Sequence, residues 1–237
     1  MSAIPIFFGI LLVIALATLW HLRVRHLREA HIRSFALPKG LYDKLRERHP
    51  ALSLKECQLV AQGLRQFFLT YLKSGRRHVS MPSQVVDDLW HEFILYTRGY
   101  QMFCDKAFGR FLHHTPAAAL SITSGQSNAG LRRCWWHACR DENINPVKPA
   151  RLPLLFALDT KLNIRNGFRY AADCASVRRV GMAVPAAGAA VIYCGGDFSS
   201  TSMDGGIDGF GSDGGASDSA DADSGSGCGG GGCGGGD

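Results

Sequence analysis

The chain has 237 residues, which allows one ordinary domain with additional segments and excludes several large domains. Its net charge of +6 is unevenly distributed, because residues 195–237 hold eight aspartates and no lysine or arginine, which leaves +14 for residues 1–194. Such a surplus indicates an anionic partner: a membrane surface, nucleic acid, or the chain's own acidic tail.

The N-terminal segment is predicted to be a membrane anchor. Ile4 to Trp20 is a run of 17 residues without a charge, the lower limit for crossing a hydrocarbon core of about 30 Å. The basic sequence HLRVRHLREAHIR follows it, which favours a retained anchor over a cleaved signal peptide. The positive-inside tendency then predicts a single-pass protein with its N-terminus outside and its main domain in the cytosol.

The organisation that we predict is mainly α. Residues 1–22 form the transmembrane anchor, 23–39 a basic juxtamembrane segment, 40–178 a compact helical domain, 179–194 an apolar segment of open role, and 195–237 a tail. The tail holds 17 of the 28 glycines and almost no large apolar residues. It cannot bury enough surface to offset its ordering entropy, so we expect it to be disordered.

Two long helices are predicted within the domain. Ser53 and Glu56 form a capping-box pattern, and the apolar positions that follow recur with helical spacing up to Tyr71. A second helix is predicted from about Ser83 to about Cys104, with a broad apolar stripe. Shorter helices are expected at Pro116–Ile122, Ser127–Arg140 and Pro153–Leu162, and no alternating strand series is present.

The densest group of chemically active side chains lies at Asp87 to Glu92, followed by the sequence FGRFLHH. Asp87 and His91 are one helical turn apart and therefore share a face. A turn at Gly109 can bring His113 or His114 back against them. Imidazoles and a carboxylate suit zinc or another divalent transition metal, with Cys104 as a softer candidate.

The alternative to a metal site is a purely structural role for this group, and the sequence favours that alternative. Asp87 or Asp88 would fix a partly buried His91 by a hydrogen bond, while His113 and His114 would pack against the next turn. Ligand types do not define a site without converging geometry. Cys134 and Cys139 fall on different faces of one helix, so we expect small apolar fillers there rather than a shared metal.

The stretch from Val86 to Pro116 combines a D-x-x-W-H motif, a later tyrosine and cysteine, and a histidine after an FG turn. It resembles the glycine-rich domain-containing proteins, and residues 152–170 resemble a second block of their bacterial, membrane-anchored branch. The resemblance covers residues 40–175 and implies a helical domain. Its motif falls on Asp87, Asp88, Trp90, His91, Tyr100, Cys104, Gly109 and His113 or His114. Plant members carry W-H-x-H, where this chain has Phe93.

Two functional hypotheses follow. The preferred one is a non-enzymatic, membrane-anchored interaction or scaffold protein with membrane lipid and another protein as partners. The alternative is a metal-binding, hydrolytic protein that uses Asp87, His91 and His113 or His114. The sequence contains no G-x-S-x-G elbow and no phosphate-binding loop, and no cofactor other than a divalent metal is predicted. No nucleic-acid module accompanies the arginines, so nucleic acid is not an expected partner.

Overall fold

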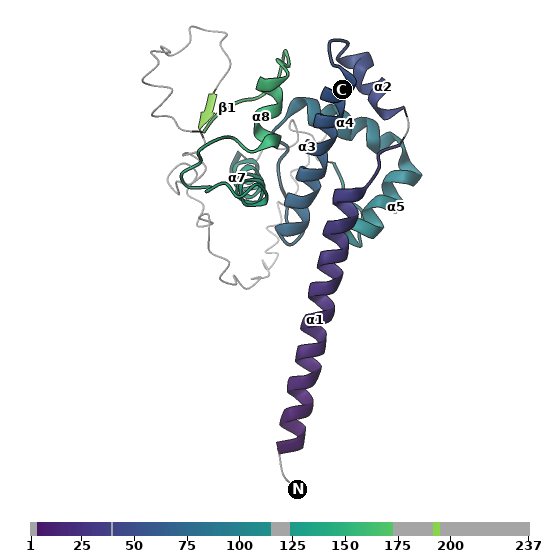
Figure 1. Ribbon diagram of the computed structural model, residues 1–237, viewed down its shortest axis with the longest axis vertical. Coiled ribbons are helices and arrows are strands. Elements are labelled where there is room, and N and C mark those ends of the chain that lie inside the picture. Colours follow the sequence, from purple (N-terminus) through teal and green to yellow (C-terminus); the bar gives the residue numbers. More distant parts are fainter. Residues whose placement is uncertain (1–3, 39, 115–123, 173–191, 195–237) are drawn as a thin grey trace, which may run out of the picture.

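The longest helix runs without a break from the apolar N-terminal segment into the folded domain. The computed structural model describes residues 4–38, 40–114, 124–172 and 192–194. Helix α1 (Ile4–Ser34) contains one candidate membrane span within Phe7–Ser34, where an 18-residue window reaches a mean hydropathy of 2.0. Its apolar part is not buried against protein, and it projects from the domain as a stem (Figure 1).

The described part of the chain is mainly helical, which confirms the predicted fold class. Helix α3 is central and contacts α1, α2, α4, α7 and α8. Aromatic rings from α3, α4 and α5 fill the core beside it. The helices after α1 are α2 (Leu41–Arg48), α3 (Leu54–Lys73), α4 (Gln84–Leu95), α5 (Thr97–Phe108), α7 (Ser124–Asp141) and α8 (Leu154–Lys161).

Helix α3 forms as its sequence predicts. The Ser53 hydroxyl accepts a hydrogen bond from the Glu56 N–H at 3.3 Å, and the Glu56 carboxylate accepts one from the Ser53 N–H at 2.7 Å, which completes the capping box. The predicted apolar stripe, including Phe67 and Phe68, is buried. The helix ends before Gly75, whose φ of +73° suits the chain reversal.

The prediction of one helix from Ser83 to about Cys104 was wrong. The chain bends at Tyr96, whose φ and ψ are −79° and 57°, and α4 and α5 lie on either side. The bend turns α5 back over the core, so that Tyr100 and Phe103 place their ring centroids 5.2 and 5.6 Å from that of Phe93. Burial of these rings on one cluster outweighs the continuity of the helix.

The predictions for the shorter elements are confirmed in part. Helices α7 and α8 confirm two predictions, while the predicted helix at 116–122 lies outside the described residues. Strand β1 (Arg169–Ala171) pairs in parallel with β2 (Ile192–Cys194), with Tyr170 opposite Tyr193. Neither these strands nor the short helix α2 was predicted. The tail and residues 179–191 also lie outside the described residues.

Asp141, at the end of α7, ties α1 to the domain. Its carboxylate accepts hydrogen bonds from Arg33 of α1 and from Lys73 of α3, the latter at 2.8 Å. Burial alone would raise the pKa of this carboxyl, but the hydrogen bonds and charges of Arg33 and Lys73 together lower it. The link therefore stabilises the fold only while Asp141 is ionised.

We expect Asp141→Asn to lower the free energy of unfolding by about 1 to 3 kcal/mol at neutral pH. Because the pKa of the folded state lies below that of the unfolded state, the contribution is complete above the ordinary carboxyl pKa and is lost as the pH falls through the folded value. Urea denaturation of both proteins at neutral pH and at about pH 3 measures this. An equal difference at both pH values would contradict the assignment.

Candidate metal site

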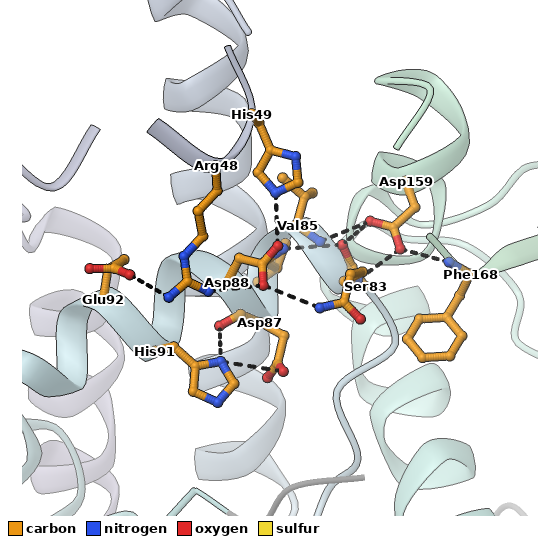
Figure 2. Close-up of polar contacts among 12 residues, drawn as sticks. Arg48, His49, Ser83, Val85, Asp87, Asp88, His91, Glu92, Asp159 and Phe168 are labelled. Carbon is orange, nitrogen blue, oxygen red and sulfur yellow. Dashed lines mark hydrogen bonds and ion pairs between the residues drawn. The ribbon is translucent and has the colours of Figure 1, made fainter. Parts of the chain in front are cut away.

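The first turn of α4 is held from outside by Asp159, a buried residue of α8. Its carboxylate accepts hydrogen bonds from the Ser83 hydroxyl at 2.7 Å and from the N–H groups of Gln84 and Val85 at 2.7 and 3.2 Å. A fourth bond comes from the Phe168 N–H at 2.8 Å (Figure 2). The negative charge also suits the positive N-terminal end of a helix, so the start of α4 is fixed in position.

Asp87 and His91 meet one turn apart on α4, as their spacing predicts. The His91 Nδ1 lies 2.9 Å from the Asp87 carbonyl oxygen and 3.5 Å from the Asp87 carboxylate (Figure 2). A carbonyl oxygen can only accept, so Nδ1 carries the proton and donates it. The lone pair of the neutral ring is then on Nε2, and the His91 side chain is 41% exposed.

His114 is the histidine that faces inward, and it joins the same carboxylate. Its Nε2 lies 2.9 Å from the Asp87 Oδ1, and its side chain is 12% exposed. The ring packs on Trp90 at a centroid distance of 4.6 Å and on His91 at 4.1 Å. His113, by contrast, is exposed and rests against Phe111.

The segment that carries His114 is held by a buried chain of hydrogen bonds. The Trp90 Nε1 donates to the Tyr100 hydroxyl at 3.1 Å, and this hydroxyl donates to the Leu112 carbonyl at 2.6 Å. The Leu112 backbone also hydrogen-bonds to the Cys104 thiol. Burial raises the pKa values of Tyr100 and of Cys104, so both side chains stay protonated. Tyr100 and Cys104 therefore position His114 rather than join it.

Gly109 makes the turn between α5 and His114. Its φ of +72° lies in the left-handed region, where glycine carries no steric penalty, and it closes the C-terminal end of α5. A side chain would also meet the Arg28 guanidinium, because a Cβ atom at Gly109 would lie 2.6 Å from an Arg28 nitrogen. The turn thus favours glycine at this position, while the Arg28 guanidinium, at the end of a flexible side chain, could move aside.

The other two carboxylates of α4 already pair with side chains at the end of α2. Asp88 pairs with the His49 Nε2 at 2.8 Å, and Glu92 pairs with Arg48 at 2.7 Å, which connects α4 to α2 (Figure 2). Asp87 has no lysine or arginine partner among the residues that the structure describes. It is the one carboxylate of this helix whose side-chain partners are histidines alone.

The three side chains lie close to the spacing that one metal ion needs. One donor atom each from Asp87, His91 and His114 can be chosen so that all lie within 4.8 Å of one another. Two ligands bound to one zinc ion at about 2.0 to 2.2 Å are roughly 3.3 to 3.6 Å apart in tetrahedral geometry and about 4.4 Å apart at most. The separation of up to 4.8 Å is larger, so side-chain rotation has to bring the donor atoms closer before they share one ion.

The region that carries these three residues also has counterparts in other proteins. A family model described as UCP032817-like matches residues 27–198, which is most of the chain and includes all three. The chain belongs to the UCP032817-like family. Neither a curated protein nor a solved structure matches this UCP032817-like chain. The match begins within α1, so the lower part of the long helix lies outside the matched region.

Several chemically notable residues of this UCP032817-like protein do not join the group. Cys57, Cys104, Cys134 and Cys139 are free and buried, and burial raises the pKa of the last two thiols to about 12. Cys134 and Cys139 act as packing groups, as predicted, while Cys104 also holds the Leu112 backbone. Sequence reasoning missed Asp159 and His49, which reach α4 from other helices and carry no motif.

Proposed function

We propose that this protein is a membrane-anchored metal-binding protein whose ion is held by Asp87, His91 and His114. The observation that supports this is the convergence of two imidazoles on one carboxylate that has no basic partner among the described residues. Two histidines and one carboxylate are a common ligand set for zinc and for non-haem iron. Of the two hypotheses drawn from the sequence, metal binding is thus preferred over the scaffold role.

The arrangement leaves room for chemistry at the ion. Three protein ligands leave at least one coordination position for water or substrate, and the exposed His91 side chain puts this position at the surface. The Nδ1–H of His91 is already bound to a carbonyl, which orients the ring as second-shell groups do at metal sites. The chemical class that we propose is hydrolysis by a metal-activated water.

Metal binding at this site would require the other tautomer of His114. Its Nε2 now donates to the Asp87 carboxylate, so the neutral ring would offer this atom to an ion only after its proton had moved to Nδ1. Protons compete with a metal ion for imidazole and carboxylate ligands, so affinity for the ion is expected to fall as the pH is lowered. Calorimetric titration with zinc at several pH values measures this dependence.

The test of the proposal is elemental analysis of the full-length, detergent-purified protein beside two variants. We expect near-stoichiometric zinc, iron or manganese in the wild type, and its loss from His91→Ala with the helical content retained. His113→Ala is the matched control, because its ring lies next in sequence to His114 but faces solvent. Wild-type protein that stays metal-free after incubation with all three ions would refute the proposal.

We further propose that α1 anchors the chain in a membrane with the domain on the cytosolic side. The length and hydropathy of Phe7–Ser34 support the anchor, and the arginines that follow Trp20 support the orientation. After an alkaline carbonate wash, the protein should remain in the membrane pellet. Release into the supernatant would contradict the anchor, and digestion of the domain by protease added outside intact cells would contradict the orientation.

A relationship to the glycine-rich domain-containing proteins is also proposed, in their bacterial, membrane-anchored branch. It is supported by the role of the shared motif, since Trp90, Tyr100, Cys104 and Gly109 all serve to place His114. The second histidine of the plant W-H-x-H pattern is replaced by Phe93, which is fully buried in the core. Position 93 faces away from the site, so this replacement removes no ligand from it.

A second candidate function, binding of a protein partner, is favoured by an open groove. Its volume is about 690 Å³, and it lies between the end of α1, α3, α8 and the end of α7. Leucines line it together with charged residues, as at many transient interfaces. Its lining includes Arg33, Leu59, Arg65, Leu69, Glu142 and Leu154. A cross-linker placed at position 59 that captures no specific protein from membranes would argue against this function.

A further inference from the structure

Basic side chains from three elements gather where α1 leaves the domain. We call this group the basic end, and it consists of Arg28, Arg76, Arg77, Lys106 and Arg110. Arg76 and Arg77 follow the last turn of α3, while Lys106 and Arg110 lie at the end of α5. Both helices contact α1, and they end on the side of the domain from which the long helix projects (Figure 1).

Hydrogen bonds hold Arg76 and Arg110 together within this group. Arg110 donates to the Tyr71 hydroxyl at 2.9 and 2.7 Å and also to the Arg76 carbonyl. Arg76 donates to the Phe108 carbonyl at 3.0 Å, which links the end of α3 to the end of α5. The Arg28 guanidinium lies against Gly109, so α1 contributes to the same surface.

The positive charges of the basic end are not neutralised by the described part of the chain. Its hydrogen bonds go to carbonyl and hydroxyl oxygens, and none of its five residues forms an ion pair there. Of the nearby acids, Glu29 pairs with Arg25 and Lys73, while Asp105 accepts a hydrogen bond from Gln101 and forms no ion pair with the basic end. Arg77, Lys106 and Arg110 are exposed to solvent.

The continuous helix fixes how far this surface lies from the bilayer. Arg28 is eight residues beyond Trp20, and at about 1.5 Å per residue this places it roughly 12 Å further along α1. The headgroup layer on each side of a bilayer is about 5 to 8 Å thick. With a screening length of about 8 to 10 Å, the basic end is within electrostatic reach of the headgroups.

We infer that the basic end binds the headgroups of anionic phospholipids in the bilayer that holds α1. The inference rests on the proposed membrane anchor and deepens it, because it names the lipid class and the residues that contact it. Phosphate oxygens are the acceptors that arginine prefers, and a convergent set of guanidinium groups can share one or two of them. The lipid contact adds a second attachment beside the apolar helix.

Native mass spectrometry of the full-length protein in detergent, titrated with phosphatidylglycerol or phosphatidylcholine, tests the inference. We expect preferential retention of phosphatidylglycerol, reduced on the order of tenfold in the exposed triple variant Arg77→Gln/Lys106→Gln/Arg110→Gln. The matched control is Lys148→Gln/Lys161→Gln/Arg165→Gln, which removes the same charge from exposed positions outside the basic end and should retain the lipid. Tryptophan fluorescence confirms that both variants are folded.

Three outcomes would overturn the inference. Equal retention of phosphatidylglycerol by the triple variant and the wild type would exclude the basic end, and equal loss in the control would reduce the effect to net charge. Displacement of the lipid by millimolar inorganic phosphate would assign the surface to a free anion instead. Failure of the anchor itself is recognised separately, because the protein would then leave membranes in alkaline carbonate whatever its lipid selectivity.

Discussion

Asp159→Ala is expected to lower the free energy of unfolding by about 3 to 5 kcal/mol, the largest stability effect of any single substitution considered. The carboxylate is 1% exposed and accepts four hydrogen bonds, two of them from N–H groups in the first turn of α4. Its removal leaves these donors buried without an acceptor. Urea denaturation followed by tryptophan fluorescence measures the loss.

The matched control for this prediction is Asp105→Ala. Asp105 is an exposed aspartate on α5 whose carboxylate accepts one bond, from Gln101 at 2.9 Å. A change within about 0.5 kcal/mol is expected there, as for most surface substitutions. If Asp159→Ala proved as mild as this control, Asp159 would not be the group that fixes the start of α4. Asp159→Asn, which keeps one acceptor oxygen, should fall between the two.

Tyr100→Phe is expected to weaken metal binding by about 10- to 100-fold although Tyr100 is not a ligand. The substitution removes the acceptor of the Trp90 N–H and the donor to the Leu112 carbonyl, so two buried polar groups lose their partner. The segment that presents His114 to Asp87 is then less well held. Competition for zinc against a chelator of known affinity measures the effect.

Tyr71→Phe separates positioning from general destabilisation. It removes a tyrosine hydroxyl that is also buried and also hydrogen-bonded, in this case to Arg110, but that does not contact the metal-site residues. We expect a comparable fall in stability and unchanged zinc affinity. A similar loss of zinc in both variants would show that Tyr100 acts only through the stability of the fold.

Local signals made part of this fold predictable. The capping box at Ser53 and Glu56 and the apolar period that follows depend on residues within one helix, and α3 forms as expected. The bend at Tyr96 was not predictable in this way, because it places Phe93 and Phe103 in one aromatic cluster with rings from distant parts of the chain, Phe35 and Phe68. Helix propensity near Gly99 gave no sign of a bend three residues earlier.

Part of the candidate site was predictable from the sequence for the same reason. Asp87 and His91 share a helical face, and the glycine turn suggested that a histidine returns to them, as His114 does. The choice between His113 and His114 depends on which one packs against Trp90, a contact across 24 residues of sequence. Asp159 lies still further from its partners on α4 and belongs to no motif. Such long-range partners are set by packing.

Because α1 is unbroken, the domain is rigidly connected to the part of the helix that forms the stem. A helix turns by about 100° and advances about 1.5 Å for each residue, so a single residue inserted between Trp20 and Arg28 would swing the whole domain around the stem axis. Seven inserted residues would return the domain to nearly its original orientation around the helix axis and would move it about 10 Å further from the bilayer. The number of residues in this short span therefore sets how far the domain stands from the bilayer and how it is oriented around the helix axis.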